Sequence, residues 1–161
     1  MIILRLVLIV LTATLASGAA AQTNINLGAI NADPSAPVEI TADILTVDQD
    51  TGLAVFEGNV VIGQDELRLS AARVQVTYDG VSGDITRLSA SGGVTFVTAT
   101  EAAESQSANY DLVAGTLLLE GEVLVTQGNS AISGDRMRVD LETGNTQIEG
   151  RVRTIFNQGG N

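Results

Sequence analysis

The sequence predicts an all-β fold in which short antiparallel strands stack into one domain, and three observations lead to this prediction. A motif with a Gly-x-Val core occurs four times, with its glycines at Gly58, Gly92, Gly121 and Gly150, at spacings of 34, 29 and 29 residues. Apolar and polar residues alternate around the copies, and turn sequences separate them. A repeat of this size indicates stacked supersecondary units, and alternation indicates half-buried strands.

The chain begins with a predicted secretory signal peptide, residues 1–21, of sequence MIILRLVLIVLTATLASGAAA. Arg5 precedes an apolar run over residues 6–16, which is shorter than the about 20 residues that a membrane-spanning helix needs. Ala19–Ala21 fits an A-x-A cleavage site. The alternative is an uncleaved membrane anchor. Residues 22–37 are rich in small and polar residues and hold both prolines, so we expect them to form a flexible leader.

The β-domain is expected to span residues 38–156, with four repeats. In the first repeat Phe56, Val60 and Ile62 share one face of an alternating strand. The other half of each unit reads apolar-x-small-x-x-apolar-x-apolar, as over residues 132–139. The extra residue after the small one shifts the alternation, which is what a bulge or a strand corner does.

Turns are predicted between the half-units at residues 50–52, 79–80, 114–115 and 142–144, where Gly follows Asp, Thr or Ala. The second unit has a longer connection, DGVSGDITRLSASGG, which accounts for its larger spacing. No convincing helical periodicity follows residue 22, and residues 157–161 are expected to be a frayed tail.

Composition excludes several functions. The chain has 8 basic residues, all arginine, against 19 acidic ones, and loss of Arg5 with the signal peptide changes the formal charge from −11 to −12. It has no cysteine, hence no disulfide or thiol nucleophile, and no histidine, the commonest base and metal ligand. The acidic balance argues against nucleic acid, and no Walker, Rossmann or G-x-S-x-G pattern is present. We expect a non-enzyme with no catalytic residue, metal or cofactor.

Two acidic patterns have a structural interpretation. The Asp-x-Asp-x-Gly run at residues 48–52 lacks the further oxygen ligands of a calcium loop, so we interpret it as a turn. Asp65-Glu66 falls in a predicted turn, and Glu120 and Glu122 point outward from an alternating strand, so solvated carboxylates are favoured over acid–base catalysts.

An arginine cluster near the C-terminus leaves two interpretations. Arg136, Arg138, Arg151 and Arg153 are spaced two apart on facing repeats. Pairing with outward acidic residues across the strands is favoured, and a small cationic lip for an anionic ligand or partner is the alternative.

Two stretches carry a resemblance to a known family. Residues 42–79, ADILTVDQDTGLAVFEGNVVIGQDELRLSAARVQVTYD, resemble the opening of the OstA-like domain of lipopolysaccharide-transport proteins. Residues 107–144, SANYDLVAGTLLLEGEVLVTQGNSAISGDRMRVDLETG, continue the match to the periplasmic member of that family. The resemblance covers residues 38–152, nearly all of the expected mature chain.

The resemblance implies a twisted, open-ended β-jelly roll whose two sheets splay like a V, located in the periplasm. It implies that lipopolysaccharide moves along a groove, with its lipid A acyl chains inside and its sugars outside. It further implies an LptC-like inner-membrane protein at the N-terminal edge, an LptD-like outer-membrane translocon at the C-terminal edge, and head-to-tail self-association through edge strands.

Physical reasoning supports such a groove. Burial of one methylene is worth about 0.8 kcal/mol, so an aliphatic trough stabilises a multi-acyl lipid without any chemistry. The inward-facing candidates for this lipid-binding groove are Phe56, Val60, Ile62, Leu69, Val74, Val76, Phe96, Tyr110, Leu119, Val123, Ile132, Met137, Val139 and Ile148.

Plain core packing is the alternative for each of these residues. Two other functions stay open for the chain: the membrane-tethered LptC-like partner of the same system, and a self-associating structural β-solenoid with a dry, filled core.

Overall fold

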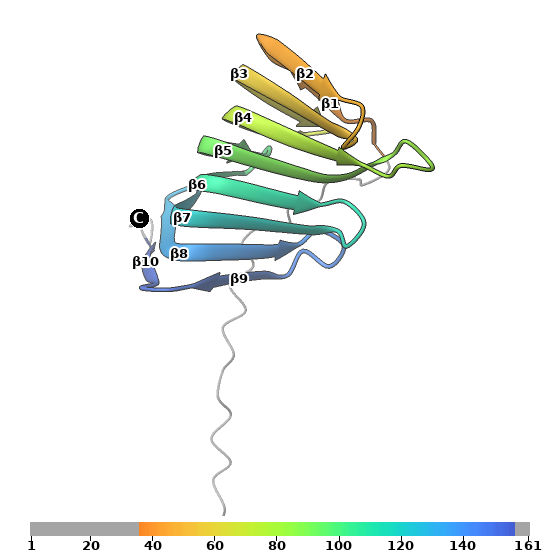
Figure 1. Cartoon of the computed structure of the whole chain (residues 1–161). Coiled ribbons are helices and arrows are strands. Elements are labelled where there is room, and N and C mark those ends of the chain that lie inside the picture. Colours follow the sequence, from red (N-terminus) through yellow and green to blue (C-terminus); the bar gives the residue numbers. More distant parts are fainter. Residues whose placement is uncertain (1–35, 157–161) are drawn as a thin grey trace, which may run out of the picture.

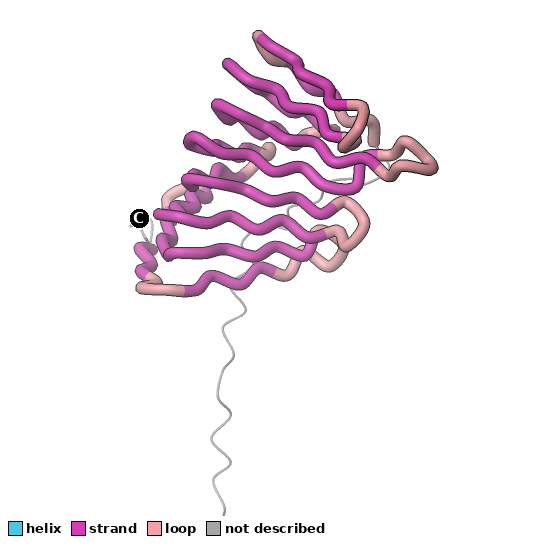
Figure 2. Tube along the Cα trace, in the orientation of Figure 1, coloured by secondary structure: helices cyan, strands magenta, loops and turns pink. Residues whose placement is uncertain are grey.

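A computed structural model describes residues 36–156 (Figure 1), and the predicted signal peptide, most of the predicted leader and the predicted tail lie outside this range. The all-β prediction is confirmed: the described residues form strands and no helix (Figure 2), so none of them belongs to a helix that could cross a membrane. The strands are β1 (Glu39–Thr41), β2 (Ile44–Asp48), β3 (Leu53–Gln64), β4 (Leu67–Tyr78), β5 (Ile85–Val97), β6 (Glu101–Asp111), β7 (Thr116–Gln127), β8 (Ser130–Asp140), β9 (Thr146–Glu149) and β10 (Arg153–Phe156).

All neighbouring strands are antiparallel. Strands β3 to β8 follow one another in chain order, with β1 and β2 both paired to β3 and with β9 and β10 both paired to β8. The six central strands have 11 to 13 residues, which is longer than the short strands that the sequence predicts. Each long strand takes part in two layers because it bends near its middle.

The register divides the strands into a front layer and a back layer, in the orientation of Figure 1. The front layer contains β2, β9 and one half of each strand from β3 to β8. The back layer contains β1, β10 and the other half of each of these strands. Front-layer residues are 44–48, 53–57, 73–78, 85–91, 107–111, 116–120, 136–140 and 146–149. Back-layer residues are 39–41, 60–64, 67–71, 94–97, 101–105, 123–127, 130–134 and 153–156.

Each bend is a bulge built on the repeated glycine. The pairing of β3 with β4 runs from Glu57 opposite Arg73 to Val60 opposite Ala71, so Gly58 and Asn59 share one opposing residue. Gly58 has φ +78° and Asn59 has φ +46°, a left-handed pair that Gly adopts without steric cost. The pairs 92–93, 121–122 and 150–151 repeat this geometry.

Each bend involves two neighbouring strands, and the sequence predicted the bend in only one of them. The extra residue after Ala42 predicted a corner, and the strand breaks there between Thr41 and Ile44. The strand with the Gly-x-Val motif is continuous and keeps its predicted inward face, but the sequence did not reveal its bulge, where Gly58 and Asn59 lie opposite one residue of β4. Because two residues of β3 form the bulge, the alternation of inward and outward side chains continues unchanged past it. Phe56 and Val60 therefore face the same interior on either side of the bend.

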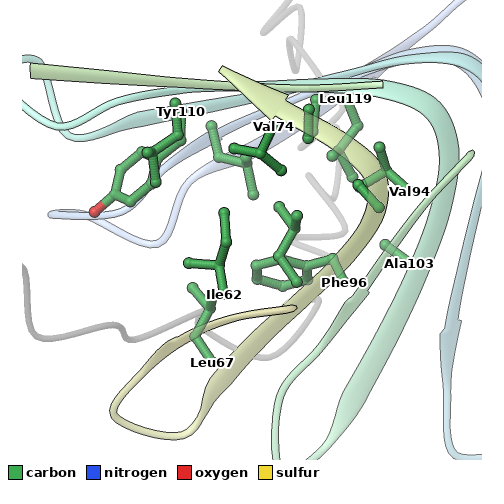
Figure 3. Packing of buried hydrophobic residues seen from close by; sticks show 14 of the residues in the cluster. Ile62, Leu67, Val74, Val94, Phe96, Ala103, Tyr110 and Leu119 are labelled. Atoms are coloured by element: carbon green, nitrogen blue, oxygen red, sulfur yellow. The ribbon is translucent and has the colours of Figure 1, made fainter. Parts of the chain in front are cut away.

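The core fills the space between the two layers. Val74 and Leu119 of the front layer face Ile62 and Phe96 of the back layer, and all four are almost completely buried (Figure 3). In each central strand every second side chain points inward, and most of these side chains are apolar. Together they form a continuous apolar lining across β3 to β8.

Candidate functional site

The fourteen candidate groove residues all point into the space between the layers. Twelve of them are buried, whereas Phe56 and Ile148 are partly exposed because they lie next to the end strands β2 and β9. The alternation therefore predicted the inner surface correctly, and the role of these residues in lipid binding stays a prediction.

Other residues of the same surface were not among the fourteen groove candidates. They are mainly alanines, and leucines or valines beside the candidates, and the alternation of the repeat had already placed Ala71, Ala103, Ala108 and Val125 on the inward face. These buried residues are Ala54, Leu67, Ala71, Leu88, Ala90, Val94, Ala103, Ala108, Leu117, Val125 and Leu141.

The interior is close-packed. A gap in the apolar lining, on the side where the strands turn, has a volume of about 20 Å³, which is about the space that one water molecule needs. The gap lies between Ile62, Leu67 and Leu69 of the back layer and Leu88 and Ala108 of the front layer. A gap of this size would admit an acyl chain only if the two layers moved apart.

The two layers are joined by the chain only at the bends, in the part that the structure describes. At the opposite side, which we call the mouth, the layers end in separate turns: residues 49–52, 79–84, 112–115 and 141–145 in front, and residues 65–66, 98–100 and 128–129 behind. Opening the mouth would separate side chains without breaking the ladder hydrogen bonds within either layer.

Aspartates close the front turns. Asp48 Oδ1 accepts hydrogen bonds from the backbone N–H groups of Asp50 and Thr51, at 2.9 and 3.1 Å, so the turn interpretation of residues 48–52 is confirmed. Asp79 and Asp140 accept two backbone N–H bonds in the same way. These bonds lower the pKa of all three carboxyl groups, because they stabilise the charged form.

Polar side chains lie just inside the mouth. Tyr110 donates its hydroxyl to Gln64 Oε1 at 3.4 Å, and Gln64 Nε2 donates to the carbonyl of Ala36 at 3.1 Å. Gln127 Nε2 donates to Glu101 Oε1 at 3.0 Å. Burial raises the pKa of Glu101 and of Tyr110. Gln64 and Glu101 were not predicted, because they lie at strand ends beside turn residues and belong to no sequence pattern.

Two of the four C-terminal arginines pair across strands as expected. Arg136 Nη2 lies 2.7 Å from Glu120, and Arg151 Nη2 lies 2.6 Å from Asp135. No carboxylate partner is seen for Arg138 or Arg153 among residues 36–156, so pairing explains half of the cluster.

Both ends of the interior are open. Leu45 and Val47 of β2 face inward but are 54% and 59% exposed, because no strand among residues 36–156 pairs with the outer side of β2. At the other end Phe156 of β10 is 56% exposed. Each end thus combines an unpaired strand edge with apolar side chains.

The fold and its bends match a known protein family. A sequence profile of the family described as LptA/(LptD N-terminal domain) LPS transport protein matches residues 39–145. The chain belongs to this family. The match extends from β1 into the turn before β9 and includes the first three bulges with their glycines, so the bends described above are part of the family's domain.

A relative and a solved structure extend the comparison. An uncharacterized protein of Rhizobium meliloti (strain 1021) is 28% identical over 151 residues, which cover 86% of this chain and 81% of that protein. The fold is also similar to that of LptH, described as the LptA-homologous periplasmic component of the lipopolysaccharide transport device of Pseudomonas aeruginosa. The TM-score is 0.71 at 16% identity, over 79% of this chain and 99% of LptH.

Proposed function

We propose that the chain is a periplasmic lipopolysaccharide carrier that shelters lipid A acyl chains between its two layers. The observation that carries this proposal is the interior surface, which is apolar on both layers from β2 and β1 at one end to β9 and β10 at the other. Membership of the LPS transport family supports the substrate class, and the likeness to periplasmic LptH supports the compartment.

The driving force is burial of methylene groups. Each one removed from water is worth about 0.8 kcal/mol, so a lipid with tens of them gains about tens of kcal/mol in an apolar interior. The protein supplies the surface, and no covalent step is needed. We therefore propose a non-enzymatic carrier.

Electrostatics determine which part of the lipid is held. A mature chain with 7 arginines and 19 acidic residues, or −12 in charge, repels an anionic head group. Attraction comes from the acyl chains, and the head group stays in solvent outside the mouth.

The open ends favour a segment of a longer conduit. A partner that adds a strand to β1 and β2, or to β9 and β10, would cover Leu45 and Phe156 and continue the apolar lining. The edges also differ in charge. Glu39, Asp43 and Asp48 lie on the N-terminal edge, whereas the C-terminal edge carries Glu149 together with Arg153 and with Arg151, which pairs with Asp135. An acidic N-terminal edge opposite Arg153 suits a head-to-tail joint with a second copy or with LptC-like and LptD-like proteins of the same fold.

Photocrosslinking tests the carrier proposal. A benzophenone amino acid at Phe56 or Tyr110 faces the interior, and the same residue at the neighbouring Val55 or Asn109 faces outward on the same strands. We expect lipopolysaccharide to crosslink at the two interior positions and not at their neighbours. Equal capture on both faces, or capture at neither interior position, would contradict the proposal.

A further inference from the structure

A small cavity interrupts the packing between the layers on the side of the mouth. It has a volume of about 20 Å³, and its walls are apolar: Ile62 and Leu69 behind, Leu88, Ala90 and Ala108 in front. Leu67 and Gln64 flank the turn at residues 65–66, which places the cavity close to the mouth. Side chains that line a gap lose part of their packing attraction, so the two layers gain less from contact here than where side chains meet directly.

One polar pair stands beside this cavity. The hydroxyl of Tyr110, in the front layer, donates to Gln64 Oε1, in the back layer, so the bond crosses the interior. Its length of 3.4 Å is beyond the usual range for an O–H donor, which indicates a weak bond. Figure 3 shows the Tyr110 hydroxyl turned away from Val74 and Leu119, on the side of Ile62 and Leu67.

We propose that this cavity is the first acyl-chain subsite of the groove, and that the Tyr110–Gln64 hydrogen bond is a latch that an incoming chain displaces. The inference rests on the proposed carrier function. An apolar pocket with one or two polar groups is the usual form of a ligand site. The expected ligand is an amphiphile whose acyl chain is joined to its polar part by an ester or amide. The chain occupies the widened cavity, and Tyr110 transfers its hydrogen bond to the carbonyl oxygen.

Two pairs of variants of the mature chain test the proposal, with dansyl-labelled undecanoic acid as the probe. Ala108→Val fills the cavity, and Ala103→Val adds the same methyl groups on the same strand at a buried position outside the cavity lining. Tyr110→Phe removes the latch hydroxyl and keeps the ring. Tyr78→Phe is its control, because Tyr78 packs against the same core with no hydroxyl bond among residues 36–156. Thermal unfolding of each variant verifies folding.

We expect Ala108→Val, which adds two carbons, to weaken probe binding by about tenfold or more, because even one methylene changes binding in an apolar pocket by about tenfold, and we expect Ala103→Val to have a smaller effect. We expect Tyr110→Phe to speed association by about two- to tenfold, the factor that a net hydrogen bond gives, and Tyr78→Phe to leave the rate unchanged. Failure of either comparison overturns the proposal.

Lipopolysaccharide uptake by the unmodified chain separates this proposal from the carrier function. If the unmodified chain binds lipopolysaccharide while the four variants behave alike, the subsite and latch are wrong and the carrier function stands. If the unmodified chain binds neither lipopolysaccharide nor the fatty acid, both proposals are overturned.

Discussion

The carboxylate of Asp135 lies against Gly150 and accepts hydrogen bonds from Nε and Nη2 of Arg151, at 3.3 and 2.6 Å. At the other end of the molecule Asp43 lies against Gly58 in the same way and accepts a hydrogen bond from Asn59 at 2.8 Å. The two bends are therefore built alike. They explain why the sequence repeats itself across the chain: what the repeat encodes is the corner that folds one long strand into two layers.

The corner glycines predict a large effect of a single methyl group. A Cβ on Gly121 would lie 2.7 Å from Gln106 Oε1 and 2.8 Å from Gln106 Cβ, at a φ of +82°. We expect Gly121→Ala to destabilise the protein by more than the about 1–2 kcal/mol of a left-handed alanine. Gly128→Ala is the control, because Gly128 also has a positive φ but has nothing within 4 Å. Urea denaturation measures both, and equal losses would show that contact at the corner adds no cost.

Burial predicts very different effects for two phenylalanines. Phe96 is 1% exposed between the layers, whereas Phe156 is 56% exposed at the C-terminal edge. We expect Phe96→Ala to cost about 3–5 kcal/mol of unfolding free energy, and Phe156→Ala less than about 1 kcal/mol. Chemical denaturation of the two variants checks this, and similar losses would mean that Phe156 belongs to the core.

The strands, the turns and the inward faces were predictable, because alternation is a local signal that a single strand carries by itself. The folded-over arrangement was predictable only in part. A break near Ala42 and Asp43 is visible in the sequence, because one additional residue there reverses the alternation of inward and outward side chains. The bulge at Gly58 contains two residues, so the alternation continues unchanged and the sequence does not reveal the bend. The interior polar groups were not predictable, because the bond from Tyr110 to Gln64 joins positions 46 apart that only the folded layers bring together.

The buried carboxyl group of Glu101 predicts a pH dependence. Burial raises its pKa above the usual 4.5, so the folded state favours the protonated form, and stability falls as the pH rises through the raised pKa. Glu101→Gln removes this loss and can still accept the hydrogen bond from Gln127. We expect the variant to be more stable than the unmodified protein at pH 7.5, with a difference that shrinks toward zero below about pH 4.

Urea denaturation between pH 3.5 and 8 measures this difference. The front-turn aspartates lose their own contribution at low pH in both proteins, so their effect cancels in the comparison. Glu104→Gln is the matched control, because Glu104 is exposed on the outer face of the same strand. A gain for Glu104→Gln that equals the gain for Glu101→Gln would assign the effect to net charge rather than to burial.

The free edge of β2 predicts a substitution that blocks docking and spares the fold. Asp43 N–H donates to the Gly58 carbonyl, and hydrogen bonds alternate along an antiparallel pair. The N–H groups of Leu45 and Val47 therefore point at β3, and that of Thr46 points at the free edge. Thr46→Pro removes only the outward donor, so we expect the isolated domain to unfold at nearly the same urea concentration as the unmodified one.

Docking is where the substitution should act. A strand added to β2 needs the Thr46 N–H, and proline both removes it and places its ring in the path of the incoming strand. We expect self-association in sedimentation velocity, and binding of an LptC-like periplasmic domain, to weaken by about tenfold or more, the effect of a lost and unsatisfied hydrogen bond at an interface. Thr46→Val keeps the N–H and should dock normally. If both variants dock equally well, the N-terminal joint does not use β2, and the partner must approach through β1 instead.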